Sequence, residues 1–213
     1  MADHTKQYPT QGALAREQLR RRGLPYFRDV NEEVKTRLAR LPVPARQAFS
    51  LACATRALRM DERLPPPLQS SHAAELRPLL DALWKGLGAE GEAARVLGRF
   101  RPLLARLQAS DELTAASPTL LTTLYLADCC VRGDVASASG AGSTAVDAAF
   151  RIADQELQLD PNVFVWDPAA EPMPLAQEAM HPAVQGELAE QRAALALLES
   201  EGATQEALVR LRG

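Results

Sequence analysis

Aliphatic residues recur at helical spacing in one segment of this chain after another, and this repetition constrains the fold more than any other feature. In residues 70–88 the apolar positions fall three and four apart, at Leu76, Leu79, Leu80, Leu83, Trp84 and Leu87. Residues 91–109 repeat the pattern. This spacing gathers apolar side chains on one face of a helix, whereas a strand needs strict alternation. No segment alternates convincingly, so the sequence predicts an all-α fold.

The length and composition fit a single compact multi-helix bundle. A chain of 213 residues is long enough to bury a real core. Only 5% of its residues are aromatic, so Ala and Leu must supply most of that core. Start and stop signals along the chain predict about eight or nine helices.

The strongest start signal is Ser117 followed by Pro118. A serine hydroxyl caps a helix, and proline at the first helical position loses no hydrogen bond. Gly133 is expected to end this helix, whose apolar face places it at the centre of the bundle. Residues 142–159 are expected to form the next helix. The Gly/Ser-rich residues 137–145 are interpreted as a flexible turn that caps it; the alternative is a cradle for phosphate, although the P-loop lysine spacing is missing.

We expect the chain to have two parts. Residues 1–40 are predicted to be a basic N-terminal extension with one or two short helices, one of them beginning at Asp29 or Asn31 as cap. Residues 41–213 are predicted to form the helical domain.

The charges are distributed unevenly along the sequence. Residues 1–46 carry ten Lys/Arg against five Asp/Glu, whereas residues 154–206 carry eleven Asp/Glu and a single basic residue, Arg192. Either the two ends attract one another within the fold, or the acidic end offers a surface to a basic partner. The arginines at 20–22 stand without interleaved aromatic residues, so a solvated helix face is favoured over binding of nucleic acid.

The helical pattern fails in residues 160–180, which contain four prolines. We predict an irregular surface loop here, anchored by Phe164, Val165 and Trp166. A loop of this length is unusual in a compact domain and is often functional.

His181 begins a segment rich in carboxylates and amides and is the main candidate for chemistry. Zinc binding would need a second histidine about four residues away on the same helix face, and none is present. Pro182 follows a cap position, so the favoured interpretation is a helix start with a solvated acidic face. That face would carry Gln185, Glu187, Glu190 and Gln191.

The cysteines and the lack of long apolar runs suggest a cytoplasmic protein. Cys53, Cys129 and Cys130 give an odd number without a disulfide spacing, and they lie among apolar residues. Buried, inert thiols are therefore expected. No signal peptide or membrane-spanning segment is visible, and no metal or cofactor is predicted.

Residues 41–200 carry, in order, elements that resemble the YjaG-like family of small all-helical bacterial proteins of unknown function. These elements are Gln47, Phe49, Cys53 and Arg56, then Leu80, Trp84 and Leu87, then Pro182, Gln185 and Glu187. The resemblance implies an all-helical fold and no established activity. Thr55 stands where the family has an acid, and residues 59–71 replace an aromatic-rich stretch.

These observations favour a non-enzymatic binding protein. The most concrete hypothesis is an immunity protein that neutralises a cognate bacterial toxin through an acidic surface, by weak architectural analogy to other helical immunity proteins. Its expected partner-binding residues are Asp160, Trp166, Asp167, Glu171, Glu178, Glu187 and Glu190. The alternatives are a helical scaffold or homo-oligomer, and an enzyme that combines His181 with Glu187, Arg56 or Asp128. A cavity holding at least two of those four side chains within hydrogen-bond reach would favour the enzyme.

Overall fold

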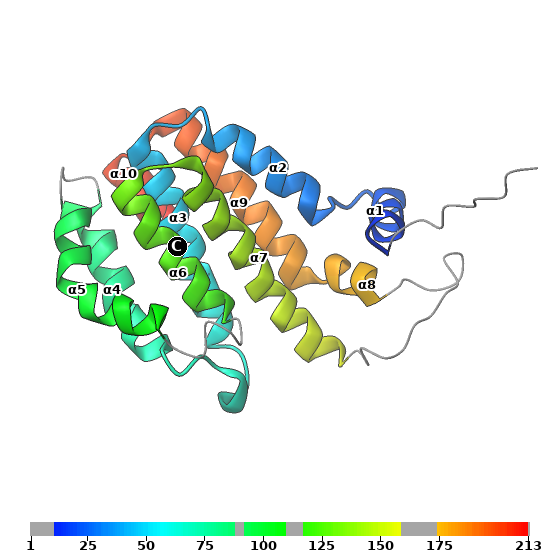
Figure 1. Ribbon diagram of the computed structural model, residues 1–213. Coiled ribbons are helices and arrows are strands. Elements are labelled where there is room, and N and C mark those ends of the chain that lie inside the picture. Colours follow the sequence, from blue (N-terminus) through cyan, green and yellow to red (C-terminus); the bar gives the residue numbers. More distant parts are fainter. Residues whose placement is uncertain (1–10, 88–91, 110–116, 159–173, 213) are drawn as a thin grey trace, which may run out of the picture.

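The computed structural model describes residues 11–87, 92–109, 117–158 and 174–212, and within them every regular element is helical (Figure 1). The elements are α1 (Gln11–Arg21), α2 (Phe27–Leu38), α3 (Val43–Asp61), the 3-10 turn η1 (Pro66–Leu68), α4 (Ala73–Gly86), α5 (Glu92–Gln108), α6 (Pro118–Arg132), α7 (Val135–Leu157), α8 (Pro174–Met180), α9 (Pro182–Glu201) and α10 (Gln205–Arg212). The all-α prediction is confirmed. None of the described helices combines the length and apolar character that crossing a membrane requires.

Three helices, α3, α6 and α7, pack on one another at the centre of the bundle. The helices α2 and α9 pack on α7, and α4 packs on α3. Figure 1 shows α4 and α5 at one end of the molecule and α1 and α8 at the other. Phe49 on α3 is fully buried in the core, where most of its neighbours are Ala, Leu and Val, as the composition predicts.

The signals predicted for α6 are confirmed. The Ser117 hydroxyl accepts a hydrogen bond from the Leu120 amide, Pro118 is the first helical residue, and Gly133 ends the helix in the left-handed conformation with φ 66°. Arg46 then donates to the carbonyls of Gly133, just beyond the end of α6, and Leu38, at the end of α2.

The turn predicted for residues 137–145 is wrong, because this segment lies inside α7. Asp134 begins the helix by accepting hydrogen bonds from the amide and the hydroxyl of Ser137, at 2.7 and 2.9 Å. The small residues allow close contact with other helices: a Cβ at Gly140 would lie 2.6 Å from the Tyr125 ring on α6, and one at Gly142 would lie 3.4 Å from the Phe49 ring. Close packing, not a turn, explains this composition.

The N-terminal region is joined to the same core. Val30, Val34 and Leu38 of α2 are buried in the main hydrophobic cluster, so the boundary predicted at residue 40 falls within one packing unit. The cap predicted at Asp29 or Asn31 is wrong, because α2 begins at Phe27. Apolar packing sets this start: the Phe27 ring meets the Phe150 ring of α7 edge-on at 5.2 Å.

Opposite charges join the two ends of the sequence. Arg37 on α2 donates to both carboxylate oxygens of Glu199 on α9, at 2.9 and 2.8 Å. Arg192, the single basic residue of the acidic segment, pairs with Glu33 on α2. The internal attraction considered from the sequence is therefore present between α2 and α9.

The irregular loop predicted over residues 160–180 is too long at its C-terminal end, because residues 174–180 form α8. Pro174 is the first residue of this helix, a position that proline favours. Ala176 and Ala179 of α8 pack with Ala15 and Leu19 of α1 in a small second cluster. The proposed anchors Phe164, Val165 and Trp166 lie outside the described residues.

Candidate functional site

His181 is confirmed as the start of α9. Its Nδ1 accepts a hydrogen bond from the Ala183 amide at 3.2 Å, and its Nε2 lies 3.2 Å from a carboxylate oxygen of Glu156 on α7. Because Nδ1 acts as an acceptor, the ring proton of the neutral imidazole is on Nε2, facing Glu156. Both ring nitrogens are thus occupied: Nδ1 caps the start of α9, and Nε2 joins α9 to α7.

Glu187, predicted to be solvated and to contact a partner, is instead buried. Its side chain is 2% exposed, and it accepts hydrogen bonds from Nε and Nη2 of Arg56 on α3, at 2.8 and 3.0 Å. Gln191, also predicted on the solvated face, is fully buried and donates both to Glu187 and to the Gly142 carbonyl on α7. This network joins α3, α7 and α9 within the core.

Burial sets the protonation of the groups around this pair. Although burial disfavours a charged guanidinium, the Glu187 carboxylate raises the pKa of Arg56, so the pair remains ionic. Burial raises the pKa of Cys53, 3.4 Å from Arg56, to about 12. Burial also raises the pKa of Cys129, and that of Cys130 to about 12. All three thiols are free, buried and protonated at neutral pH, as predicted.

A cavity of about 270 Å³ opens beside this pair, between α3 and α9. This α3–α9 cavity is lined by Arg56, Arg59, Met60, Arg63, Pro182, Ala183, Gly186 and Glu187. It brings two of the four side chains considered for catalysis, Arg56 and Glu187, within hydrogen-bond reach of each other, which is the condition set above for the enzyme alternative. Their bidentate pairing leaves neither carboxylate oxygen of Glu187 available as a base, and Asp128 lies on α6 near Arg132, outside the cavity lining.

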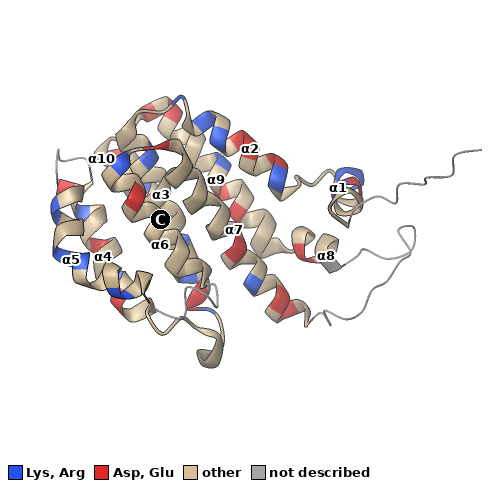
Figure 2. Ribbon diagram, in the orientation of Figure 1, with Lys and Arg blue, Asp and Glu red and all other residues tan. Residues whose placement is uncertain are grey.

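Of the other residues predicted to bind a partner, two lie in the described part of the chain. Glu190 is exposed on α9, and Glu178 is partly buried on α8. Figure 2 shows basic and acidic residues mixed along α2, with further acidic residues on α7 and α8. The remaining members of the set, Asp160, Trp166, Asp167 and Glu171, lie outside the described residues.

Glu178 interacts with a second carboxyl group, that of Asp154 on α7. Burial raises the pKa of Glu178 to about 7, with a further contribution from Asp154, and burial also raises the pKa of Asp154. A raised carboxyl pKa means that the folded state is favoured while the group is protonated. Its stabilising effect is therefore lost as the pH rises from about 4.5 to about 7.

We expect Glu178→Gln to stabilise the protein by about 1 kcal/mol at pH 8, because the amide needs no proton to remain beside Asp154. This stabilisation is smaller than the full pKa shift of Glu178 implies, because solvent screens the partly exposed side chain. At pH 4.5 the variant and the wild type should be equally stable. Urea unfolding across this pH range measures the difference, and a constant difference between the two proteins would contradict the assignment.

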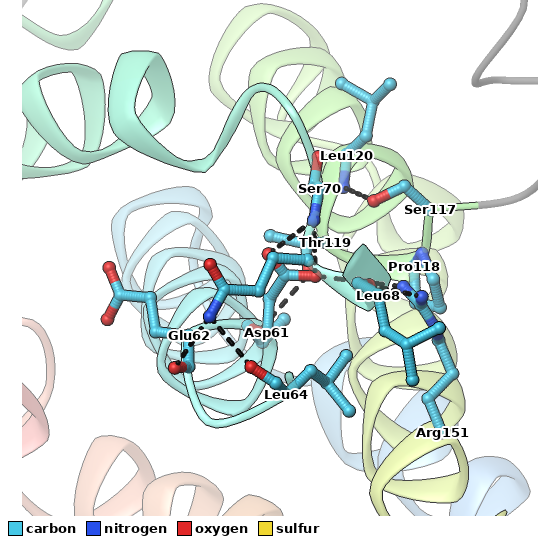
Figure 3. A network of polar contacts seen from close by, with 12 residues as sticks. Asp61, Glu62, Leu64, Leu68, Ser70, Ser117, Pro118, Thr119, Leu120 and Arg151 are labelled. Atoms are coloured by element: carbon cyan, nitrogen blue, oxygen red, sulfur yellow. Dashed lines mark hydrogen bonds and ion pairs between the residues drawn. The ribbon is translucent and has the colours of Figure 1, made fainter. Parts of the chain in front are cut away.

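Asp61 at the end of α3 is buried and holds a turn in place (Figure 3). Its carboxylate accepts from the Ser70 amide at 3.0 Å and lies 3.7 Å from Arg151 of α7. Arg151 also donates to the Leu68 carbonyl at 2.8 Å. Figure 3 shows these contacts fastening the segment around η1 across α3 and α7. Asp61 does not line the α3–α9 cavity. We therefore assign its network a structural role, which is to hold the segment around η1 in place.

A larger groove, of about 670 Å³, lies between α2, α6 and α7. We call it the α2–α7 groove; it is lined by Arg28, Asp29, Asn31, Glu32 and Lys35 of α2, Tyr125 of α6, and Ala136, Ser139, Gly140, Ser143 and Thr144 of α7. The small side chains of α7 leave the space, and the residues of α2 and Tyr125 border it. Sequence reasoning identified the Gly/Ser-rich segment but not the helices that it faces.

Many polar groups of the α2–α7 groove have no polar partner within the described residues. Arg28, Glu32 and Lys35 form no ion pair there, and the hydroxyls of Ser139 and Ser143 form no hydrogen bond. Arg28 and Lys35 are seven residues apart on one helix, which separates them by about 10 Å along its axis. The groove thus presents two cations, Arg28 and Lys35, and two carboxylates, Glu32 and the Asp29 that pairs with Arg16, together with hydroxyl groups of α7.

Comparisons with protein-family models, curated proteins and solved structures find no match to this chain, so the YjaG-like resemblance stays a prediction.

Proposed function

We propose that this chain is a non-enzymatic binding protein whose α2–α7 groove takes a polar segment of a partner protein. The observation that carries the proposal is the set of polar groups along the groove that have no polar partner in the described part of the chain, since such groups can hydrogen-bond to a ligand without breaking contacts there. The volume of about 670 Å³ is within the range of ligand-binding clefts.

The charges of the groove specify the partner segment. Arg28 and Lys35 favour acidic groups about 10 Å apart, and Glu32 between them favours a hydrogen-bond donor. Tyr125, 39% exposed, offers an aromatic face of the kind enriched at binding interfaces. The partner is therefore expected to contribute acidic side chains at both ends of the contact.

Affinity capture from the native lysate, followed by calorimetry with the captured partner, tests this proposal. The variant Arg28→Glu/Lys35→Glu should weaken binding at least tenfold, since it places like charges opposite one another. Its matched control is Arg99→Glu/Arg101→Glu, which makes the same change of net charge on the exposed side of α5 and should bind as the wild type does. Equal binding by the groove variant would refute the groove as the site.

Our second proposal, also a binding function, is an immunity role through an acidic surface. It predicts a basic partner, whereas the groove predicts an acidic one. Binding of a basic toxin should be weakened by Glu178→Lys/Glu190→Lys, which introduces repulsion, and should be unchanged in Arg28→Glu/Lys35→Glu. Capture of a second copy of the chain would instead favour the homo-oligomer. The lysate experiment separates these outcomes.

A further inference from the structure

The helices α1 and α8 form a small unit of their own at one end of the molecule (Figure 1). Among the described helices, α1 packs chiefly on α8. Their shared cluster buries Ala15, Leu19, Tyr26, Ala176 and Ala179, and the three alanines bring little apolar surface to it. A helix of seven residues is not stable alone, so α8 is held only through its contacts with neighbouring helices.

Two buried polar atoms in this region favour its opening. The Tyr26 hydroxyl and Oε1 of Gln18 on α1 are buried, and neither has a hydrogen-bond partner in the part of the chain that the structure describes. Each atom gives up its hydrogen bonds to water when the helices pack and gains none in return, which costs free energy. Opening the α1–α8 unit hydrates these atoms again.

A carboxyl pair joins α8 to α7. Glu178 on α8 and Asp154 on α7 share a hydrogen bond, which requires a proton on one of the two groups. Burial and the neighbouring Asp154 raise the pKa of Glu178 to about 7, so Glu178 carries that proton. Once Glu178 ionises, two carboxylates face one another and repulsion replaces the hydrogen bond.

The other charged groups around α8 already have partners. The helices that pack against α8 are α1, α7 and α9. Apart from Asp154, the charged groups of α1, of the last two turns of α7 and of the first two turns of α9 form pairs, which are Arg16 with Asp29, Glu17 with Arg20 and Arg21, Arg151 with Asp61, Glu156 with His181, and Glu187 with Arg56. Arg151 also favours the ionised form of Asp154, which leaves the shared proton on Glu178.

We propose that the Glu178–Asp154 pair is a pH-operated latch: while Glu178 is protonated the pair holds α8 and α1 on the bundle, and ionisation of Glu178 releases the two helices together. The ordinary pKa of 4.5 applies to Glu178 in the open form, and the value of about 7 applies in the closed form. The latch is therefore fully effective below pH 4.5, and its effect is lost as the pH rises to about 7.

Release of α1 changes the charge of the α2–α7 groove. Nε of Arg16 on α1 donates to the Asp29 carboxylate at 2.9 Å, and Asp29 lines the groove. In the open form Asp29 loses this cation, which disfavours an acidic partner segment, so binding should weaken above pH 7. This consequence rests on the proposed function, whereas the opening of α1 and α8 can be measured without any ligand. A groove that binds nothing would leave the latch unaffected.

Amide hydrogen exchange of the full chain at pH 5 and pH 8 tests the latch. The rates are expressed as protection factors, which removes the intrinsic effect of pH on exchange. Glu178→Gln keeps the size of the side chain, and its amide can donate to Asp154 at every pH. Glu190→Gln is the matched control, because it makes the same change at an exposed acid of α9.

In the wild type and in Glu190→Gln, we expect the protection factors of α1 and α8 to fall together by at least about tenfold from pH 5 to pH 8. This fall is smaller than the full pKa shift implies, because Glu178 is partly exposed. In Glu178→Gln the fall should be absent. At pH 8 both helices of the wild type should be less protected than α3, α6 and α7, as local opening requires. The proposal would be overturned by an equal fall in wild type and Glu178→Gln, by loss of protection in α8 without α1, or by exchange of α1 and α8 at the rate of the core.

Discussion

Replacing Glu187 with leucine should destabilise the protein by about 3–5 kcal/mol, as is typical when one partner of a buried ion pair is removed. The substitution leaves the Arg56 guanidinium, 15% exposed, beside an apolar side chain in the core. It also removes one of the two acceptors for the Gln191 amide, the other being the Gly142 carbonyl. Urea unfolding at pH 7 measures the loss of free energy.

The reason for this large cost is desolvation, and the double variant Arg56→Met/Glu187→Leu separates it from the attraction between the charges. Removing both charges leaves no unpaired ion, so the double variant should recover most of the stability lost by Glu187→Leu. The control Glu190→Leu changes an exposed acid one turn further along the same helix and should stay within about 0.5 kcal/mol of the wild type. A Glu187→Leu variant as stable as that control would contradict the burial of the pair.

Features set by neighbouring residues could be predicted from the sequence. Ser117, Pro118 and Gly133 mark the ends of α6 through contacts within a few residues, and His181 caps α9 in the same way. The leucine spacing of α4 identifies its buried face for the same reason. These signals are local, so the sequence contains all the information that they require.

Features set by distant helices could not be predicted in this way. Glu187 resembles its neighbour Glu190 in a helical pattern, and only Arg56, 131 residues away, distinguishes the buried acid from the exposed one. Six of the nine residues in 137–145 are glycine, serine or threonine, which favour a helix less than alanine does, so the segment resembles a loop. Close packing against α3 and α6 outweighs this local preference and includes them in α7.

The two candidate binding sites could not be predicted from the sequence either, because each combines residues from separate helices. The α2–α7 groove combines three helices, and Arg28, Tyr125 and Ser143 belong to no common motif. The sequence indicates Arg56 and Glu187, which line the α3–α9 cavity, as candidates for catalysis, but as partners of His181 and not of each other. The structure makes His181 a cap and places the arginines of α3 at the cavity instead.

Phe49→Ala should cost about 3–5 kcal/mol, because the ring is fully buried where α3 crosses α7 and its removal leaves a cavity. Gly142→Leu alone should cost about 1–3 kcal/mol, since its Cβ would meet the Gln191 Oε1 at 3.2 Å and the Phe49 ring at 3.4 Å. Both substitutions act on the same space from opposite helices.

Combining the two should therefore cost less than their sum, because the leucine on α7 occupies part of the space that the phenylalanine leaves on α3. We expect a favourable coupling of at least about 1 kcal/mol in a double-mutant cycle measured by urea unfolding. The pair Phe49→Ala with Gly98→Leu is the control, and its effects should add within about 0.5 kcal/mol, since Gly98 lies on α5, outside the α3–α7 contact. Additive costs for Phe49→Ala and Gly142→Leu would mean that α7 is not held against α3 through this contact, and the placement of residues 137–145 in the core would be wrong.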